Sequence, residues 1–87
     1  MKHTLSGDGE TREVYLDGKW LDPAPSQKYY NHSPDGFSWG YGGSGCSQLA
    51  LAIMLKLTGK AGKYMEFKFD FIAGLPFDQD FEKEFEL

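Results

Sequence analysis

The sequence has little cysteine, few cations and no long apolar run, and each shortage excludes a class of protein. Its single cysteine, Cys46, cannot form an internal disulfide or a zinc site made of cysteines, which favours a reducing compartment. No run of about 18 apolar residues is present, and the opening residues lack the apolar core of a signal peptide. We therefore expect a cytoplasmic protein without a membrane partner.

Cations are scarce relative to acids. Nine Lys and Arg residues stand against thirteen Asp and Glu residues, which gives a net charge of −4 at pH 7. Binding to a nucleic-acid backbone needs clustered cations, so we expect no nucleic-acid partner. An acidic surface could instead contact a basic protein, and acidic residues gather near the C-terminus: Asp78, Asp80, Glu82, Glu84 and Glu86.

The length of 87 residues predicts one domain, residues 1–87, with a small core. Seven Phe, five Tyr and two Trp partly offset the shortness, because each ring buries a large area. Rings that stay exposed on the folded chain could be covered in a homo-oligomer, which is one expectation for its assembly.

Residues 2–21 predict a small antiparallel sheet. Val14 and Leu16 alternate with polar or amphipathic neighbours, and Asp17-Gly18 has the residue types of a two-residue hairpin turn. Two prolines follow and are expected to end the sheet, since proline cannot donate to a ladder.

Residues 26–45 show no clear periodicity and predict a long loop rich in glycine and aromatic residues. Residues 47–58 are apolar nearly all round and predict a buried helix, with Ser44 as its N-cap and Gly59 after its last turn. One strip of this helix is expected to face water: Gln48, Ala52 and Lys56.

Periodicity leaves two later segments open. Apolar residues alternate from Met65 to Phe71 as in a strand, yet Tyr64, Phe67 and Phe71 also have the spacing of a helix. The tail, residues 76–87, fits both patterns equally well.

Residues 31–55, NHSPDGFSWGYGGSGCSQLALAIML, resemble the signature of a family of short proteins from bacteria, archaea and their phages, domain of unknown function 6166. Further matches to the family pattern are Tyr64, Phe67-Lys68 and Ile72-Ala73. The resemblance implies a helix over residues 62–74 and supplies no known activity. The fold we expect is α+β: an N-terminal antiparallel sheet, the long loop, and two helices of which the first is buried.

The sequence Gly40-x-Gly42-x-x-Gly45 directly precedes the predicted buried helix. Free N–H groups at a helix start favour an anion, so this loop is a candidate site for a phosphate group. The segment that follows lacks the strand-helix-strand context of a dinucleotide fold, and Cys46 stands where a P-loop needs Lys. The alternative is structural, because glycine lets the backbone turn tightly into a buried helix.

Trp39 and Tyr41, two residues apart, are expected to project from the same face of an extended segment. There they would stack on a base or sugar, or equally cover the apolar helix. The candidate ligand-binding residues are His32, Trp39, Tyr41, Gly42, Gly43, Ser44, Gly45 and Gln48.

Cys46 near a helix start could act as a nucleophile with His32 as its base. Members of the resembling family often carry proline in place of Cys46, which implies that the thiol is dispensable. His32 could instead hold the loop by bonding a backbone carbonyl. The other histidine, His3, is far away in the sequence, so no metal site is predicted.

Three hypotheses about function follow. The first is a non-enzymatic binding module, without a cofactor, whose loop holds a nucleotide or another phosphorylated small molecule. The second is an interaction protein that contacts a host protein through acidic and aromatic surface. By analogy with the family's phage members, either would be a phage or mobile-element protein acting against host defence in the host cytoplasm. The third and weakest is an enzyme that uses Cys46 and His32.

Overall fold

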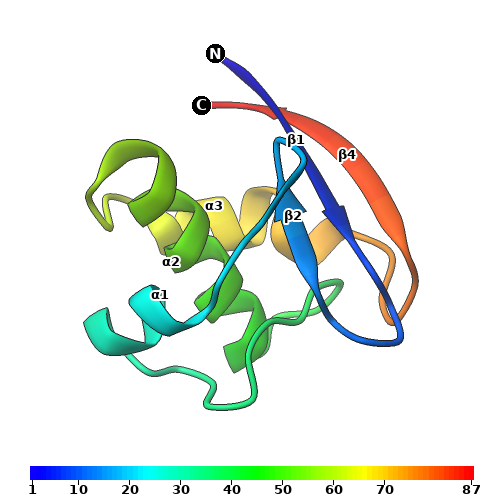
Figure 1. Cartoon of the computed structure of the whole chain (residues 1–87), viewed down its shortest axis with the longest axis horizontal. Coiled ribbons are helices and arrows are strands. Elements are labelled where there is room, and N and C mark those ends of the chain that lie inside the picture. The colour runs from blue at the N-terminus through cyan, green and yellow to red at the C-terminus, as the bar shows by residue number, and fades with distance from the viewer.

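The computed structural model describes residues 1–87 and has an α+β fold in which helices lie on one face of a single sheet (Figure 1). The sheet has the order β3-β2-β1-β4, and every neighbouring pair is antiparallel. The elements are β1 (Lys2–Gly7), β2 (Val14–Leu16), β3 (Lys19–Trp20), α1 (Ala24–Tyr29), α2 (Ser44–Thr58), α3 (Tyr64–Asp70), the 3-10 turn η1 (Ile72–Gly74) and β4 (Phe81–Glu86). None of the helices has the length and apolar character needed to cross a bilayer.

The predicted N-terminal hairpin is confirmed. Val14 and Leu16 are buried, whereas Tyr15 between them is exposed. The turn that joins β2 to β3 has positive φ at both central residues, 52° at Asp17 and 81° at Gly18. This is the type I′ geometry whose twist matches that of the flanking strands.

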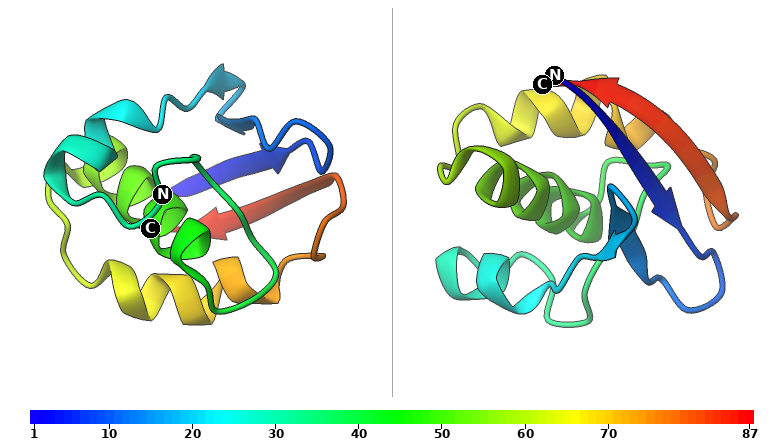
Figure 2. Two further views of the ribbon diagram at one scale, coloured as in Figure 1. Left: turned by 90° about the horizontal axis from the view of Figure 1, so that it is seen from below. Right: turned by 45° about the horizontal axis from the view of Figure 1, so that its top comes forward.

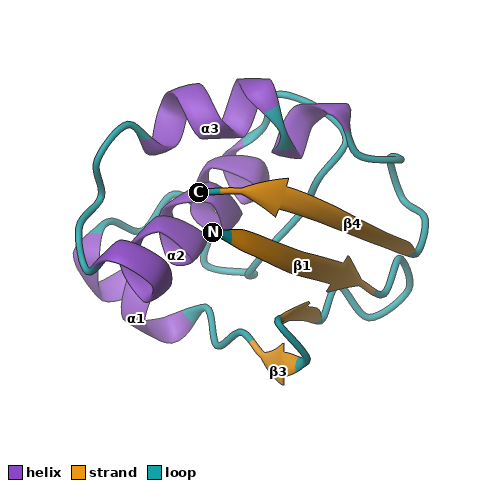
Figure 3. Cartoon of the chain, turned by 90° about the horizontal axis from the view of Figure 1, so that it is seen from above, coloured by secondary structure: helices purple, strands orange, loops and turns teal.

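The C-terminal tail, which periodicity left open, is a strand. β4 pairs with β1 along its whole length, from Lys2 opposite Glu86 to Gly7 opposite Phe81. The two chain ends therefore lie side by side (Figure 3), and the N–H of Leu87 donates to the carbonyl of Met1 at 3.0 Å. β1 is thus a central strand, and the sheet combines both ends of the sequence.

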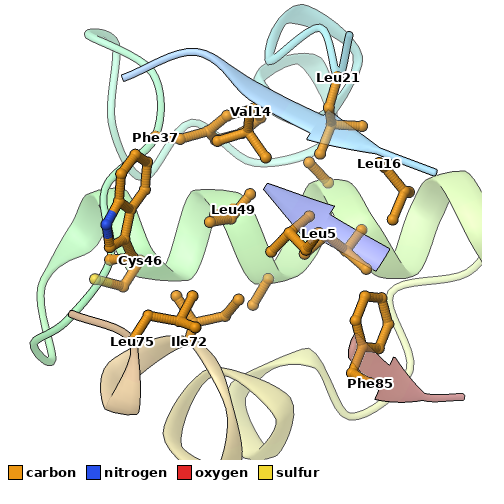
Figure 4. Close-up of a cluster of buried hydrophobic side chains, with 14 of the residues drawn as sticks. Leu5, Val14, Leu16, Leu21, Phe37, Cys46, Leu49, Ile72, Leu75 and Phe85 are labelled. Carbon is orange, nitrogen blue, oxygen red and sulfur yellow. The ribbon is translucent and has the colours of Figure 1, made fainter. Parts of the chain in front are cut away.

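The core lies between the sheet and α2, as the two views of Figure 2 show. From α2, Leu49 and Ile53 are fully buried and belong to the same apolar cluster as Leu5 and Val14 from the strands (Figure 4). The predicted buried helix is confirmed, and Gly59 ends it in the left-handed conformation with φ 76°. The N-cap is Gly43 rather than Ser44, which is the first helical residue.

A short helix, α1, overlaps the start of the segment predicted as a loop, residues 26–45, so the fold has three α-helices rather than two. Its N-cap is Pro23, and a second proline stands in its first turn, where a missing N–H breaks no hydrogen bond. α1 packs on α2 and covers most of the strip expected to face water. Gln48 and Ala52 are buried, and only Lys56 remains exposed. The helix implied for residues 62–74 is present as α3 and η1.

Candidate functional site

Trp39 does not face solvent, so the hypothesis that it stacks on a ligand is wrong. Its side chain is fully buried, its Nε1 donates to the carbonyl of Gln79 at 3.1 Å, and its ring packs edge-on against Phe81. The cause is Gly40, whose φ of +85° interrupts the extended segment, so that Tyr41 points elsewhere and is 45 % exposed. Trp39 therefore covers the core, the alternative that its sequence position left open.

Gly40 also holds the loop against η1, the 3-10 turn that follows α3. Its N–H donates to the carbonyl of Ile72 at 3.0 Å. A Cβ at this position would lie 2.5 Å from Cα of Phe77 and 2.7 Å from the carbonyl oxygen of Leu75. Only glycine satisfies both the positive φ and this close approach.

Gln48 is a buried structural residue and does not reach a ligand. Its Oε1 accepts from the N–H groups of His32 at 2.7 Å and Ser33 at 3.0 Å. Its Nε2 donates to Oγ of Ser26 at 2.9 Å and to the carbonyl of Tyr30 at 3.1 Å. Because these four bonds use the full capacity of the amide, Gln48 fixes α1 and the start of the loop onto α2.

Only part of the glycine loop is accessible. Gly45 is buried, its carbonyl accepts the N–H of Ser38 at 3.1 Å, and Cys46 is fully buried. The expected anion contact at the start of α2 is therefore reduced to Gly43 and Ser44, which reach the surface. The ring of Tyr41 covers the position that a Cβ of Gly43 would occupy.

Lys68 brings a cation to this region that the sequence analysis missed. It projects from α3 and is only 4 % exposed, yet it takes part in none of the three ion pairs of the structure. Its Nζ lies 4.7 Å from the ring centre of Phe69, and that ring is the neighbour of Gly42, just before α2. The Lys68 ammonium therefore contacts the ring that borders Gly42, two residues before α2, and it has no carboxylate within ion-pair distance.

His32 lies near enough to Lys68 to sense its charge and is hydrogen-bonded to α3 through Tyr64. Its Nε2 is 2.9 Å from the hydroxyl of Tyr64, and its ring centre is 4.5 Å from that of Tyr30. The expected bond to a backbone carbonyl is thus replaced by one to a phenol. Burial, together with the positive charge of Lys68, lowers the pKa of His32. Burial likewise raises the pKa of Tyr64, with smaller contributions from the tyrosines at positions 30 and 29.

The structure does not bring Cys46 and His32 together. The thiol of Cys46 lies in the apolar core (Figure 4), and no hydrogen bond joins it to His32, whose ring faces Tyr64. A nucleophile needs access to substrate and a base within hydrogen-bond reach, so this pair lacks both conditions. No three His, Cys, Asp or Glu side chains are grouped so that they could hold a metal ion.

Two of the residues that define the region, Lys68 and Tyr64, carried a signal in the sequence. Both belong to the family pattern and are four residues apart, which places them on one face of α3. The pattern was used only to predict a helix. Because a lysine on the buried face of a helix is rarely left without a partner, its position in the helix marks Lys68 as a candidate site residue.

The chain was compared with known families, curated proteins and solved structures. The model of a family of unknown function, DUF6166, matches residues 5–85. The chain belongs to this family. The matched range includes parts of all eight elements, and therefore the loop, His32 and Lys68. No curated protein and no solved structure matches the chain.

Replacement of Gln48 tests its structural role. In Gln48→Ala, the Ser33 N–H loses its only partner, and the His32 N–H, the Tyr30 carbonyl and the Ser26 hydroxyl each lose one of their hydrogen bonds, which we expect to lower the free energy of unfolding by about 2–4 kcal/mol. The measurement is urea unfolding followed by circular dichroism. The matched control is Gln79→Ala, which removes an exposed amide and should change the stability by less than about 0.5 kcal/mol. Equal stability of the two variants would contradict the assigned role.

Proposed function

We propose that the protein is a non-enzymatic module that binds a phosphorylated small molecule, such as a nucleotide, at the start of α2. The observation that carries the proposal is the buried Lys68 side chain beside Phe69 and Gly42. The stem of Lys68 is buried, but its ammonium still reaches solvent and is accessible to a ligand. A lysine this buried rarely lacks an anionic partner, and a cation near a helix N-terminus opposes the helix dipole. An anion at this point would compensate both unfavourable terms.

The accessible groups around Lys68 suit a phosphate. Gly43 and Ser44 are the first residues at the start of α2 that reach the surface, and neither backbone N–H has a hydrogen-bond partner within the chain. The Ser44 hydroxyl adds a further donor. Charge-assisted hydrogen bonds of this kind are short and strong, and a helix start provides several at once.

Two exposed rings support a ligand that also carries a base or sugar. Tyr41 covers Gly43, and Phe69, 60 % exposed, adjoins Gly42. Stacking on such rings tolerates different bases because every base presents a flat face. The proposed ligand-binding residues are Tyr41, Gly42, Gly43, Ser44, Lys68 and Phe69, with His32 as a neighbour that senses the charge of Lys68.

Sequestration without turnover would suit a phage or mobile-element protein that opposes a host defence dependent on a nucleotide. The support for this biological setting is the analogy with the family's phage members. The proposed site has no activated nucleophile, since Cys46 is buried in the core. Binding alone would then be the activity, exerted in the cytoplasm of the host.

The proposal is tested with inorganic phosphate and the variant Lys68→Met, which keeps the apolar stem and removes the charge. We expect phosphate to shift the amide resonances of Gly43 and Ser44 in NMR spectra at constant ionic strength. Lys68→Met should weaken the affinity at least about tenfold, or 1.4 kcal/mol. The control Lys63→Met removes an exposed lysine just before α3, at the opposite end of that helix, and should leave the affinity unchanged. Shifts that are absent, or equal in all three proteins, would refute the proposal.

The uncovered face of the sheet favours a second candidate function, contact with a basic host protein. One row of side chains crosses all four strands on the face away from the helices: Trp20, Tyr15, Ser6 and Glu82. Glu84 and Glu86 extend the acidic side of this face along β4. Aromatic rings beside carboxylates suit lysine and arginine side chains of a partner.

A short arginine-rich peptide tests this face, because Trp20 is 54 % exposed and Trp39 is buried. We expect the peptide to change Trp20 emission, and the double variant Glu82→Gln/Glu84→Gln to weaken the effect several-fold at low salt. The control Glu10→Gln/Glu66→Gln removes the same charge elsewhere. An equal loss in both double variants would show that only net charge matters and would contradict a specific surface.

A further inference from the structure

An open hollow of about 600 Å³ lies beside the glycine loop and is not part of the phosphate contact described above. Its lining residues are Arg12, Ser38, Gly40, Tyr41 and Phe77. The volume is within the range of about 300–1,000 Å³ that is typical of small-molecule sites. Tyr41 belongs to both places, since its ring covers Gly43 and also lines the hollow.

Two exposed aromatic rings form the apolar part of the hollow. Tyr41 and Phe77 meet edge to face, with ring centres 5.5 Å apart and planes at 85°. Phe77 is 54 % exposed. Such a pair offers a ring face and a ring edge to a third aromatic group, which is the arrangement that aromatic clusters favour.

Arg12 supplies an unused hydrogen-bond donor at the hollow. Its guanidinium lies 5.3 Å from the ring centre of Trp39 and pairs with the carboxylate of Asp78. Nη1 of the same guanidinium is buried and has no hydrogen-bond partner. An unpaired buried donor costs free energy, and a small rotation of the guanidinium toward the hollow would let an acceptor on a ligand recover it.

The backbone holds this arginine in an uncommon conformation. Arg12 has φ +67° and its partner Asp78 has φ +62°, although neither is glycine. Residues held in the left-handed region concentrate at binding and catalytic sites, where surrounding contacts enforce them. The ion pair thus joins two strained turns, the one before β2 and the one before β4, at the edge of the hollow.

We propose that the hollow, on the Phe77 side of Tyr41 rather than the Phe69 side, binds a nucleobase, which stacks on Tyr41 and Phe77 and accepts a hydrogen bond from Arg12. A nucleobase fits better than a plain aromatic side chain because its edge carries acceptors, and arginine pairs readily with the adjacent N7 and O6 of guanine. This inference rests on the proposed function, because a base here and a phosphate at Gly43, Ser44 and Lys68 together define a nucleotide as the ligand.

The test compares guanosine 5′-monophosphate with ribose 5-phosphate and guanosine on the full chain, with affinities from NMR titration. The nucleotide should bind at least about fivefold more tightly than ribose 5-phosphate, because fivefold is the smallest gain in affinity expected from stacking one base. Phe77→Ala, at an exposed ring, should remove that advantage and leave ribose 5-phosphate binding unchanged. Arg12→Lys, which keeps the charge but loses the planar guanidinium, should also reduce the preference for the nucleotide over ribose 5-phosphate. The control is Tyr29→Ala, at an equally exposed ring on α1.

The outcomes separate this inference from the proposed function. Equal affinity for the nucleotide and ribose 5-phosphate, with shifts confined to Gly43 and Ser44, would overturn the base site and leave the phosphate site intact. If guanosine shifts the resonances of Tyr41 and Phe77 and binds as tightly as guanosine 5′-monophosphate does, that result would support the base site and overturn the phosphate site. Failure of all three compounds to bind at millimolar concentration would overturn both.

Discussion

The buried amide of Gln48 is the contact on which the arrangement of the loop depends. Through four hydrogen bonds it joins α1, at Ser26, and the chain from Tyr30 to Ser33 to the second turn of α2. A buried amide is stable only when all its donors and acceptors are satisfied, so the loop can take few other positions. With the loop fixed, His32 is held against Tyr64, and the aromatic and glycine residues that follow are presented around the start of α2.

The charge near the start of α2 is opposite in sign to the net charge of the whole molecule. The chain carries a net charge of −4, and three of its thirteen acidic residues, Glu82, Glu84 and Glu86, lie on β4 at the uncovered face of the sheet. Near the start of α2, in contrast, the helix dipole and the free donors of Gly43 and Ser44 are joined, through the Phe69 ring beside Gly42, by the Lys68 ammonium, which forms no ion pair. Arg12 adds a second cation beyond Tyr41, although Asp78 neutralises part of its charge. A local excess of positive potential on an acidic protein is suited to an anionic ligand.

The sequence predicted what local spacing determines and missed what distant contacts determine. The hairpin at Asp17-Gly18 and the apolar helix α2 follow from turn chemistry and residue spacing, and both are present. α1 has only six residues, too few to show a period, so its cover over Gln48 was not foreseen. The burial of Trp39 depends on a bond to Gln79, forty residues away, and the burial of Lys68 depends on how α3 meets the loop. Neither fact is encoded in spacing within one segment.

At the proposed site an anion would compensate the charge of Lys68, and the pKa of His32 reports directly on that charge. This pKa is lowered by burial and by Lys68, so neutralising the ammonium must raise it. NMR titration of the His32 ring, with His3 as internal control, should give a pKa below the usual 6.5 in the free protein. The value should rise in Lys68→Met, and saturating phosphate should raise it in the native protein but not in that variant. A His32 pKa that neither the substitution nor phosphate alters would contradict the account.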